Sequence, residues 1–146
     1  MSLIPRREDW PDEKSYRFIA EICEAIRKLT PDASFYTPTF TGITNVTAIT
    51  ADVALWCRIG SIGIVAGRVV IDPTAATTLT EVDVSLPFTS NLGLTTDVSG
   101  VVGQADTQSS GNVQANTTDK RARLRFTPAD GTNRPYRFIF LFRIIQ

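Results

Sequence analysis

The sequence predicts a mainly β protein: an antiparallel β-sandwich of jelly-roll type with about eight strands, preceded by one short N-terminal α-helix. Two observations lead to this prediction. A charged amphipathic stretch ends at Pro31, and short stretches rich in β-branched residues, separated by regular turn signals, follow to the last residue. The boundary divides the 146-residue chain into an N-terminal docking segment, residues 1–32, and a β-domain, residues 33–146.

The N-terminal segment carries the pattern of a helix that buries one face. Pro11 is acceptable in a first helical turn, and Pro31 ends the helix. Isoleucine at the seam positions favours three-stranded coiled coils, although about two heptads are too few to hold a trimer unaided. A single helix packed on its own β-domain explains the pattern equally well. The residues with three-four spacing, expected at an oligomer interface, are Ile19, Ile22, Ile26 and Leu29.

The β-domain is predicted from strands separated by Gly, Pro, Ser, Asn and Asp. Gly60 and Ser61 suit the two central positions of a type II′ hairpin. The expected strands are Thr39–Ile49, Ala54–Ile59, Ile62–Ile71, Thr78–Leu86, Ser99–Ala105, Gly111–Thr117, Arg121–Thr127 and Tyr136–Ile145.

The last expected strand is apolar on both of its alternating faces. One face of an antiparallel strand usually meets water, so a strand that is apolar on both sides needs a second cover. A neighbouring subunit would supply that cover, which predicts self-association. The residues expected at the oligomer interface are Tyr136, Phe138, Phe140 and Phe142 on one face, and Ile139 and Leu141 on the other.

Composition excludes several classes of function. Lys+Arg and Asp+Glu both number 15, so net charge offers no argument for binding nucleic acid or an anionic membrane. Histidine is absent, which removes the commonest general base and metal ligand. Cys23 and Cys57 are expected as free thiols. The sequence thus indicates a non-enzymatic protein without metal or cofactor, made in a cytoplasm because the N-terminus lacks a signal peptide.

Arg121, Arg123 and Arg125 alternate with apolar residues and predict a row of guanidinium groups along one strand face. This row suits an anion site for an acidic polysaccharide or a phosphate. It suits equally a row of ion pairs, for which Glu81 and Asp83 alternate in the same way. The matching acidic strand and the zero net charge favour the ion pairs.

Two polar segments are expected as exposed loops at one end of the β-domain. Their hydroxyl and amide groups could contact a host-surface glycan, with three weak contacts acting together in a trimer. Solvated turns without a ligand are the other interpretation, and the favoured one for a decoration protein. The candidate ligand residues are Asn91, Thr95, Gln108 and Asn112.

Residues 40–105 resemble small β-domains of bacteriophage structural proteins. The resemblance lies in the aromatic–x–Arg–x–Gly turn from Trp56 to Gly60, in the Gly67-Arg68-Val69 strand and in the strand end Ser85-Leu86-Pro87. Those domains occur as capsid decoration and head-fibre proteins, and as tail-fibre and receptor-binding knobs. The resemblance implies a trimeric jelly-roll-like knob on a virion surface.

The short chain favours, within that class, a capsid decoration or cement protein, or a short head-fibre protein. Its N-terminal segment would attach it to the major capsid protein or to another virion protein. A receptor-binding knob of a tail fibre or baseplate, recognising a host-surface glycan, is the alternative. The residues expected to dock on the virion are Leu3, Ile4 and Trp10.

Overall fold

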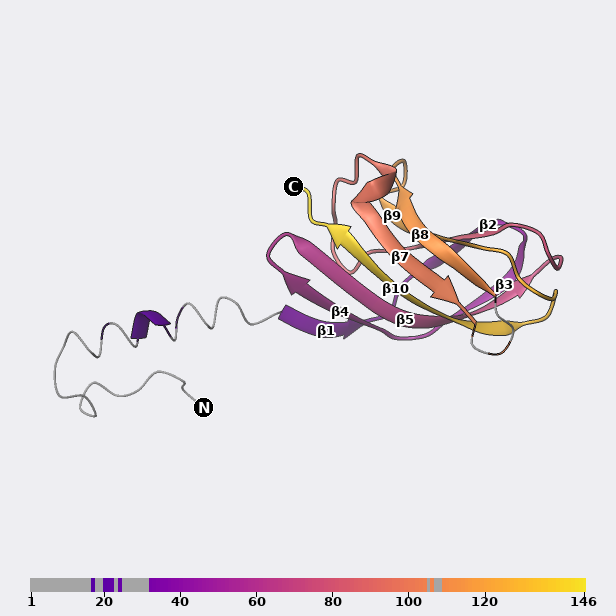
Figure 1. Cartoon of the computed structure of the whole chain (residues 1–146), viewed down its shortest axis with the longest axis horizontal. Helices are drawn as coiled ribbons and strands as arrows, with labels where there is room; N and C mark the ends of the chain where they lie inside the picture. The colour runs from indigo at the N-terminus through magenta and orange to yellow at the C-terminus, as the bar shows by residue number, and fades with distance from the viewer. Residues whose placement is uncertain (1–16, 18–19, 23, 25–31, 105, 107–108) are drawn as a thin grey trace. The chain divides into compact units, whose positions relative to one another are not determined.

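The computed structural model describes residues 17, 20–22, 24, 32–104, 106 and 109–146 (Figure 1). The chain divides into two compact units, Met1–Asp32 and Ala33–Gln146. In the first unit residues 17, 20–22 and 24 are helical, and Ile22 is exposed. The other residues predicted for the helix seam or for virion docking lie outside the described residues; they are Leu3, Ile4, Trp10, Ile19, Ile26 and Leu29.

The β-domain consists of ten strands in one hydrogen-bonded sheet, where about eight strands were expected from the sequence. Every pairing with a described register is antiparallel. A 3-10 turn, η2 (Thr95–Asp97), precedes β7. The strands are β1 (Asp32–Tyr36), β2 (Phe40–Thr44), β3 (Val46–Ala51), β4 (Ala54–Ile59), β5 (Ile62–Pro73), β6 (Thr80–Val84), β7 (Val98–Gly103), β8 (Ser110–Asn116), β9 (Arg121–Phe126) and β10 (Arg134–Arg143).

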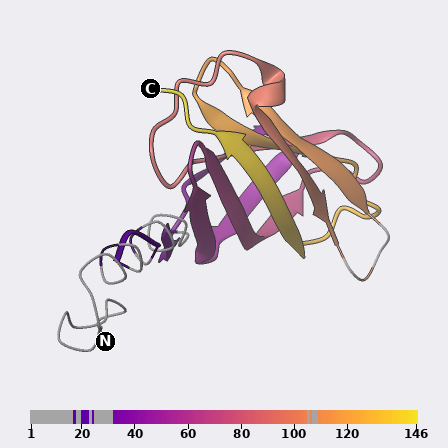
Figure 2. The ribbon, with the colours of Figure 1, turned by 60° about the vertical axis from the view of Figure 1, so that its left-hand side comes forward.

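The sheet is curled, with strand order β1-β4-β5-β10-β7-β8-β9-β6-β2 (Figure 2). The long strand β5 pairs with β10 along one edge. Along its other edge it pairs first with β4 and then with β3, because Asp52 and Val53 separate these two strands. At the far end of the path β2 pairs with β6 and also lies against β3. The curl therefore brings the two ends of the sheet together around one core.

The core is built around the inward row of β10, the strand between β5 and β7. Tyr136, Phe138, Phe140 and Phe142 are each at most 4% exposed. These four aromatic residues therefore fill the core of their own chain, and the prediction that they form an oligomer interface was wrong. The sequence shows that both faces of β10 are apolar, but only the curl of the sheet decides which face lies inside.

Glycines opposite β10 make room for its aromatic rings. Phe142 pairs with Gly63 and Phe138 with Gly67 on β5, whereas Phe140 pairs with Gly100 on β7. A Cβ added at Gly63 would collide with the Phe142 ring. The Phe142 and Phe138 rings thus occupy the space that a side chain at Gly63 or Gly67 would take, whereas a Cβ at Gly100 would meet Ile139 O and the Phe140 Cβ.

Two features of the N-terminal part of the β-domain differ from the sequence prediction. The expected strand Thr39–Ile49 is two strands, because Asn45 takes a φ of 57° between β2 and β3. Its side-chain amide nitrogen donates hydrogen bonds to Ala75 O and Thr80 Oγ1, which stabilise this conformation. Strand β1 was not expected at all. It pairs with β4, and its Tyr36 hydroxyl donates to Ser85 O at 3.0 Å.

The turn between β4 and β5 agrees with the prediction. Ile59 pairs with Ile62, and Gly60 has a φ of 59°, as the first central position of a type II′ turn requires.

The close packing of Gly63 under Phe142 can be tested with alanine. We expect Gly63→Ala to lower the free energy of unfolding by about 2–3 kcal/mol, because the ring must leave its position. Gly60→Ala is the control: its Cβ meets no atom within 4 Å, and the positive φ alone costs about 1 kcal/mol. Urea denaturation measures both; an equal loss in the two variants would contradict the packing.

Burial raises the pKa of Tyr36 above its usual value. The unfolded chain ionises this tyrosine near about pH 10, whereas the folded chain keeps its proton to higher pH. The neutral Tyr36 therefore contributes its full share to the free energy of unfolding below about pH 10, and this share is lost as the pH rises through the pKa of the folded state. We expect Tyr36→Phe to flatten the loss of stability as the pH rises above about 10, measured by urea denaturation. Burial also raises the pKa of Tyr136, so part of the loss remains.

Candidate assembly face

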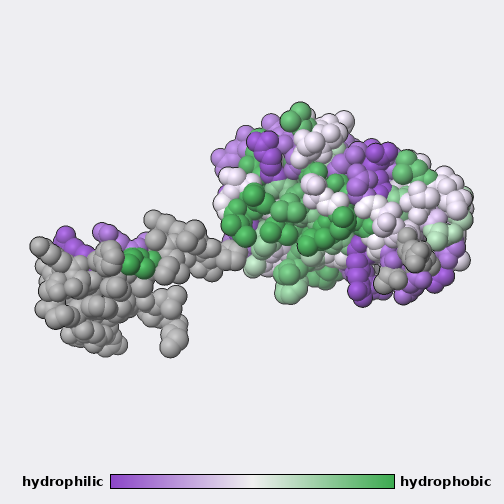
Figure 3. Space-filling view, in the orientation of Figure 1, coloured by the Kyte–Doolittle hydropathy of each residue, from purple (hydrophilic) through white to green (hydrophobic). Residues whose placement is uncertain are grey.

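The outer surface of the curled sheet is divided into an apolar and a polar half. The apolar half lies over β4, β5, β10 and β7, and Figure 3 shows hydrophobic surface gathered where Figure 1 draws β5, β10 and β7. We call it the apolar face. Its members are the outward residues Leu55, Cys57, Ile59, Ile62, Ile64, Ala66, Val101, Ile139 and Leu141.

Strand register arranges the apolar face in rows. One row runs from Leu55 through Ala66 and Ile139 to Val101, and the next passes from Cys57 through Ile64 to Leu141. Six of the large side chains are 46–60% exposed. Together they present on the order of 500 Å² of apolar surface, near the upper end of patches on monomers, which are often functional. This face is the strongest candidate for an interaction surface in the described β-domain.

Two of the residues predicted for an interface, Ile139 and Leu141, do lie on the apolar face, each 46% exposed. The prediction missed the contributions of β4, β5 and β7. A signal was present in the sequence of β5, where Ile62, Ile64 and Ala66 alternate with Gly63 and Val65, so that both faces of this strand are apolar.

The polar half lies over β6, β9 and β8, where the arginine row forms ion pairs as favoured from the sequence. Arg123 Nε donates to Asp83 Oδ1 at 2.7 Å and Arg125 Nε to Glu81 Oε1 at 2.7 Å. Asp83 is 1% exposed and also accepts a hydrogen bond from Asn116. The hydrogen bond to Asp83 raises the pKa of Arg123. Arg121 differs, because its guanidinium donates to Thr41 Oγ1.

The candidate ligand residues do not meet in one site. Asn91 lines a groove of ≈ 820 Å³ whose lining residues include neither Thr95 nor Asn112. Thr95 lies in η2. Asn112 lies within β8, paired with Val101 and Arg125, in agreement with the expected strand Gly111–Thr117 and not with its assignment to a ligand loop. Gln108 lies outside the described residues.

The segment before β7 is held by an aspartate. Asp97 Oδ2 accepts hydrogen bonds at 2.8 Å from the backbone N–H groups of Leu94 and Gly93, and Oδ1 accepts one from Arg143. These contacts lower the pKa of Asp97. The segment is therefore anchored to the end of β10.

No group of three or more His, Cys, Asp or Glu side chains is placed to hold a metal ion in the described part of the chain. Cys57 carries a free thiol on the apolar face. Among the described residues, no helix has the length and apolar character needed to cross a membrane. Comparison with protein-family models, with curated proteins and with solved structures finds no match to this chain.

The buried Asp83 makes its ion pair sensitive to the loss of one partner. We expect Arg123→Met to lower the free energy of unfolding by about 3 kcal/mol, because it leaves a buried carboxylate without its cation. Arg125→Met is the matched control on the same strand; Glu81 is more exposed, so the expected loss is below about 1 kcal/mol. Equal effects in guanidinium chloride denaturation would contradict this ranking.

Proposed function

We propose that this protein is a non-enzymatic structural component of a bacteriophage virion that assembles as a homotrimer through its apolar face. The observation that carries the proposal is the apolar face itself: a broad aliphatic surface, four strands wide, on a rigid sheet. The virion class comes from the resemblance of residues 40–105 to small β-domains of phage structural proteins. The curled sheet serves in this proposal as the jelly-roll-like knob of such a particle.

The make-up of the apolar face supports assembly with a second copy. Charged side chains border its aliphatic centre: Arg143 with Asp97 at one end, and Arg68 with Asp52 at the other. An apolar centre with a polar rim is typical of protein–protein interfaces. A standard interface buries about 800 Å² on each partner, of which the exposed aliphatic side chains supply more than half.

The knob would act as a capsid decoration or cement protein, or as a short head fibre. The N-terminal segment would attach it to the major capsid protein or another virion protein. A receptor-binding knob is the second candidate function. It is supported by the ≈ 820 Å³ groove, where Asn91 lies with three basic residues, Arg58, Lys120 and Arg121. A trimer would present three such grooves to a host-surface glycan.

Self-association is tested by placing a charge on the apolar face. Leu141 points outward, so Leu141→Asp should leave the core intact and dissociate the trimer, because a buried unpaired carboxylate is costly. Leu79→Asp is the control: this leucine is 41% exposed and lies outside the apolar face. Light scattering should report trimers for the wild type and Leu79→Asp, and folded monomers for Leu141→Asp. The Leu141→Asp monomer should still unfold cooperatively, at a lower temperature than the trimer because it lacks the stabilisation by assembly. A monodisperse wild-type monomer at micromolar concentration would contradict the proposal.

Cys57 offers an independent measurement, because its thiol lies on the apolar face. In a Cys23→Ser background, maleimide labelling of Cys57 should be slow in the trimer and fast in Leu141→Asp. Equal rates would place the interface elsewhere.

Antibody labelling of virions distinguishes the capsid shell, expected for a decoration protein, from the tail tip, expected for a receptor-binding knob.

A further inference from the structure

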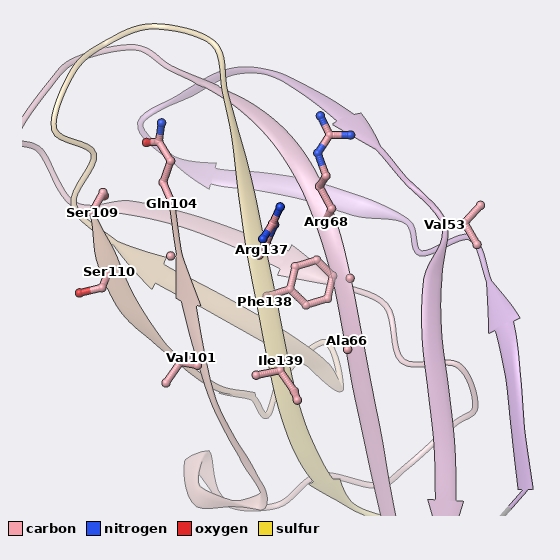
Figure 4. Close-up of a pocket in the computed structure, with 12 residues that line it drawn as sticks. Val53, Ala66, Arg68, Val101, Gln104, Ser109, Ser110, Arg137, Phe138 and Ile139 are labelled. Atoms are coloured by element: carbon pink, nitrogen blue, oxygen red, sulfur yellow. The ribbon is translucent and has the colours of Figure 1, made fainter. Parts of the chain in front are cut away.

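A groove of ≈ 900 Å³ lies at one end of the apolar face (Figure 4). Its lining includes Ala66, Ile139 and Val101 of the apolar face, on β5, β10 and β7. Next to them on β5 and β10 stand two arginines, Arg68 and Arg137. The groove thus continues the apolar face and carries positive charge at its end.

The two arginines lie directly opposite each other in the β5–β10 register, and both point outward. Like charges in this position repel each other. Arg68 is compensated, since its Nη1 lies 2.6 Å from Asp52 Oδ2. Arg137 forms no hydrogen bond or salt bridge through its side chain to any described residue. Among the described residues, Arg137 is therefore the cation of the pair that has no counter-charge.

Water solvates Arg137 in the isolated chain, but a second copy packed on the apolar face would remove that water. An uncompensated charge at a covered interface is unfavourable, whereas a carboxylate paired with a guanidinium makes short charge-assisted hydrogen bonds. The covering surface must therefore carry a carboxylate that fits beside aliphatic side chains.

We infer that Arg137, with Arg68 beside it, forms a carboxylate-binding subsite that an aspartate of a neighbouring copy completes. The inference rests on the proposed homotrimer. In a ring of three copies each contact joins two different surfaces, so the groove of one copy can receive an acid from elsewhere on the next.

The described β-domain contains suitable acids. Asp52, Glu81, Asp83, Asp97 and Asp130 already form salt bridges within the chain. Asp72, on β5, and the exposed Asp106, between β7 and β8, form none. Asp119 forms none either, but its Oδ2 accepts a hydrogen bond from Asn116, so Asp72 and Asp106 are the better candidates. One of these two carboxylates in the neighbouring copy is the counter-charge of Arg137.

Sedimentation equilibrium tests the subsite through the concentration at which the trimer half-dissociates. We expect Arg137→Gln to raise that concentration at least about tenfold and Arg137→Lys to raise it less, since a lysine keeps the charge but not the bidentate geometry. Arg121→Gln is the control, because Arg121 lies on the polar half of the sheet. Added NaCl should weaken the wild-type trimer more than the Arg137→Gln trimer. Melting temperatures verify that each variant folds.

A charge-swap experiment identifies which acid of the neighbouring copy pairs with Arg137. Arg137→Glu should dissociate the trimer, and combining it with Asp106→Arg or with Asp72→Arg should restore assembly in one of the two double variants. A wild-type trimer that Arg137→Gln and Arg137→Glu leave unchanged would overturn this inference alone, as would failure of both double variants. A wild-type protein that remains monomeric would overturn the proposed function itself.

Discussion

The packing of the aromatic row of β10 is the interaction on which the rest of the β-domain depends. Its rings contact distant parts of the sheet: Phe138 meets Phe40 of β2 with centroids 6.1 Å apart, and Tyr136 meets Phe126 of β9 at 4.3 Å. Phe142 contacts Phe88, which in turn packs edge-on against Trp56 of β4. The aromatic row of β10 therefore links strands from both halves of the strand order, and Gly63 and Gly67 on β5 leave space for two of its rings.

Because the aromatic residues of β10 fill the core, the outward-facing residues of the same strand take no part in core packing. Ile139 and Leu141 alternate with buried rings and lie beside Ala66 and Ile64 of β5. Burying these aliphatic side chains against a partner would add stability without disturbing the inner packing, because the sheet separates the two faces. The opposite half of the outer surface satisfies its charges within the chain, through Asp83 with Arg123 and Glu81 with Arg125. The outer surface is thus divided between a half with ion pairs inside the chain and a half with exposed aliphatic side chains.

Local patterns predicted several elements well. The bounds of β4 agree with the expectation, because a glycine turn and β-branched residues mark both sides of the hairpin. The ion pairs of the arginine row were also foreseeable, since residues opposite each other on neighbouring strands share the same alternation. The break at Asn45 was missed, because its left-handed conformation is stabilised by partners some thirty residues away. Strand β1 was missed because an edge strand depends on its partner β4 and not on a pattern of its own.

The sequence by itself determined most of the strands, which charges of β6 and β9 face one another, and that β10 is apolar on both sides. The tertiary structure alone decided which side of β10 is buried. Alternation assigns side chains to two faces without saying which face is inside, and that choice depends on the direction in which the whole sheet curls. The same curl brought Arg68 and Arg137 to the end of the apolar face, although the two residues lie far apart along the chain. Pairing between distant strands, which no local pattern encodes, placed the candidate interface on the outside of the molecule.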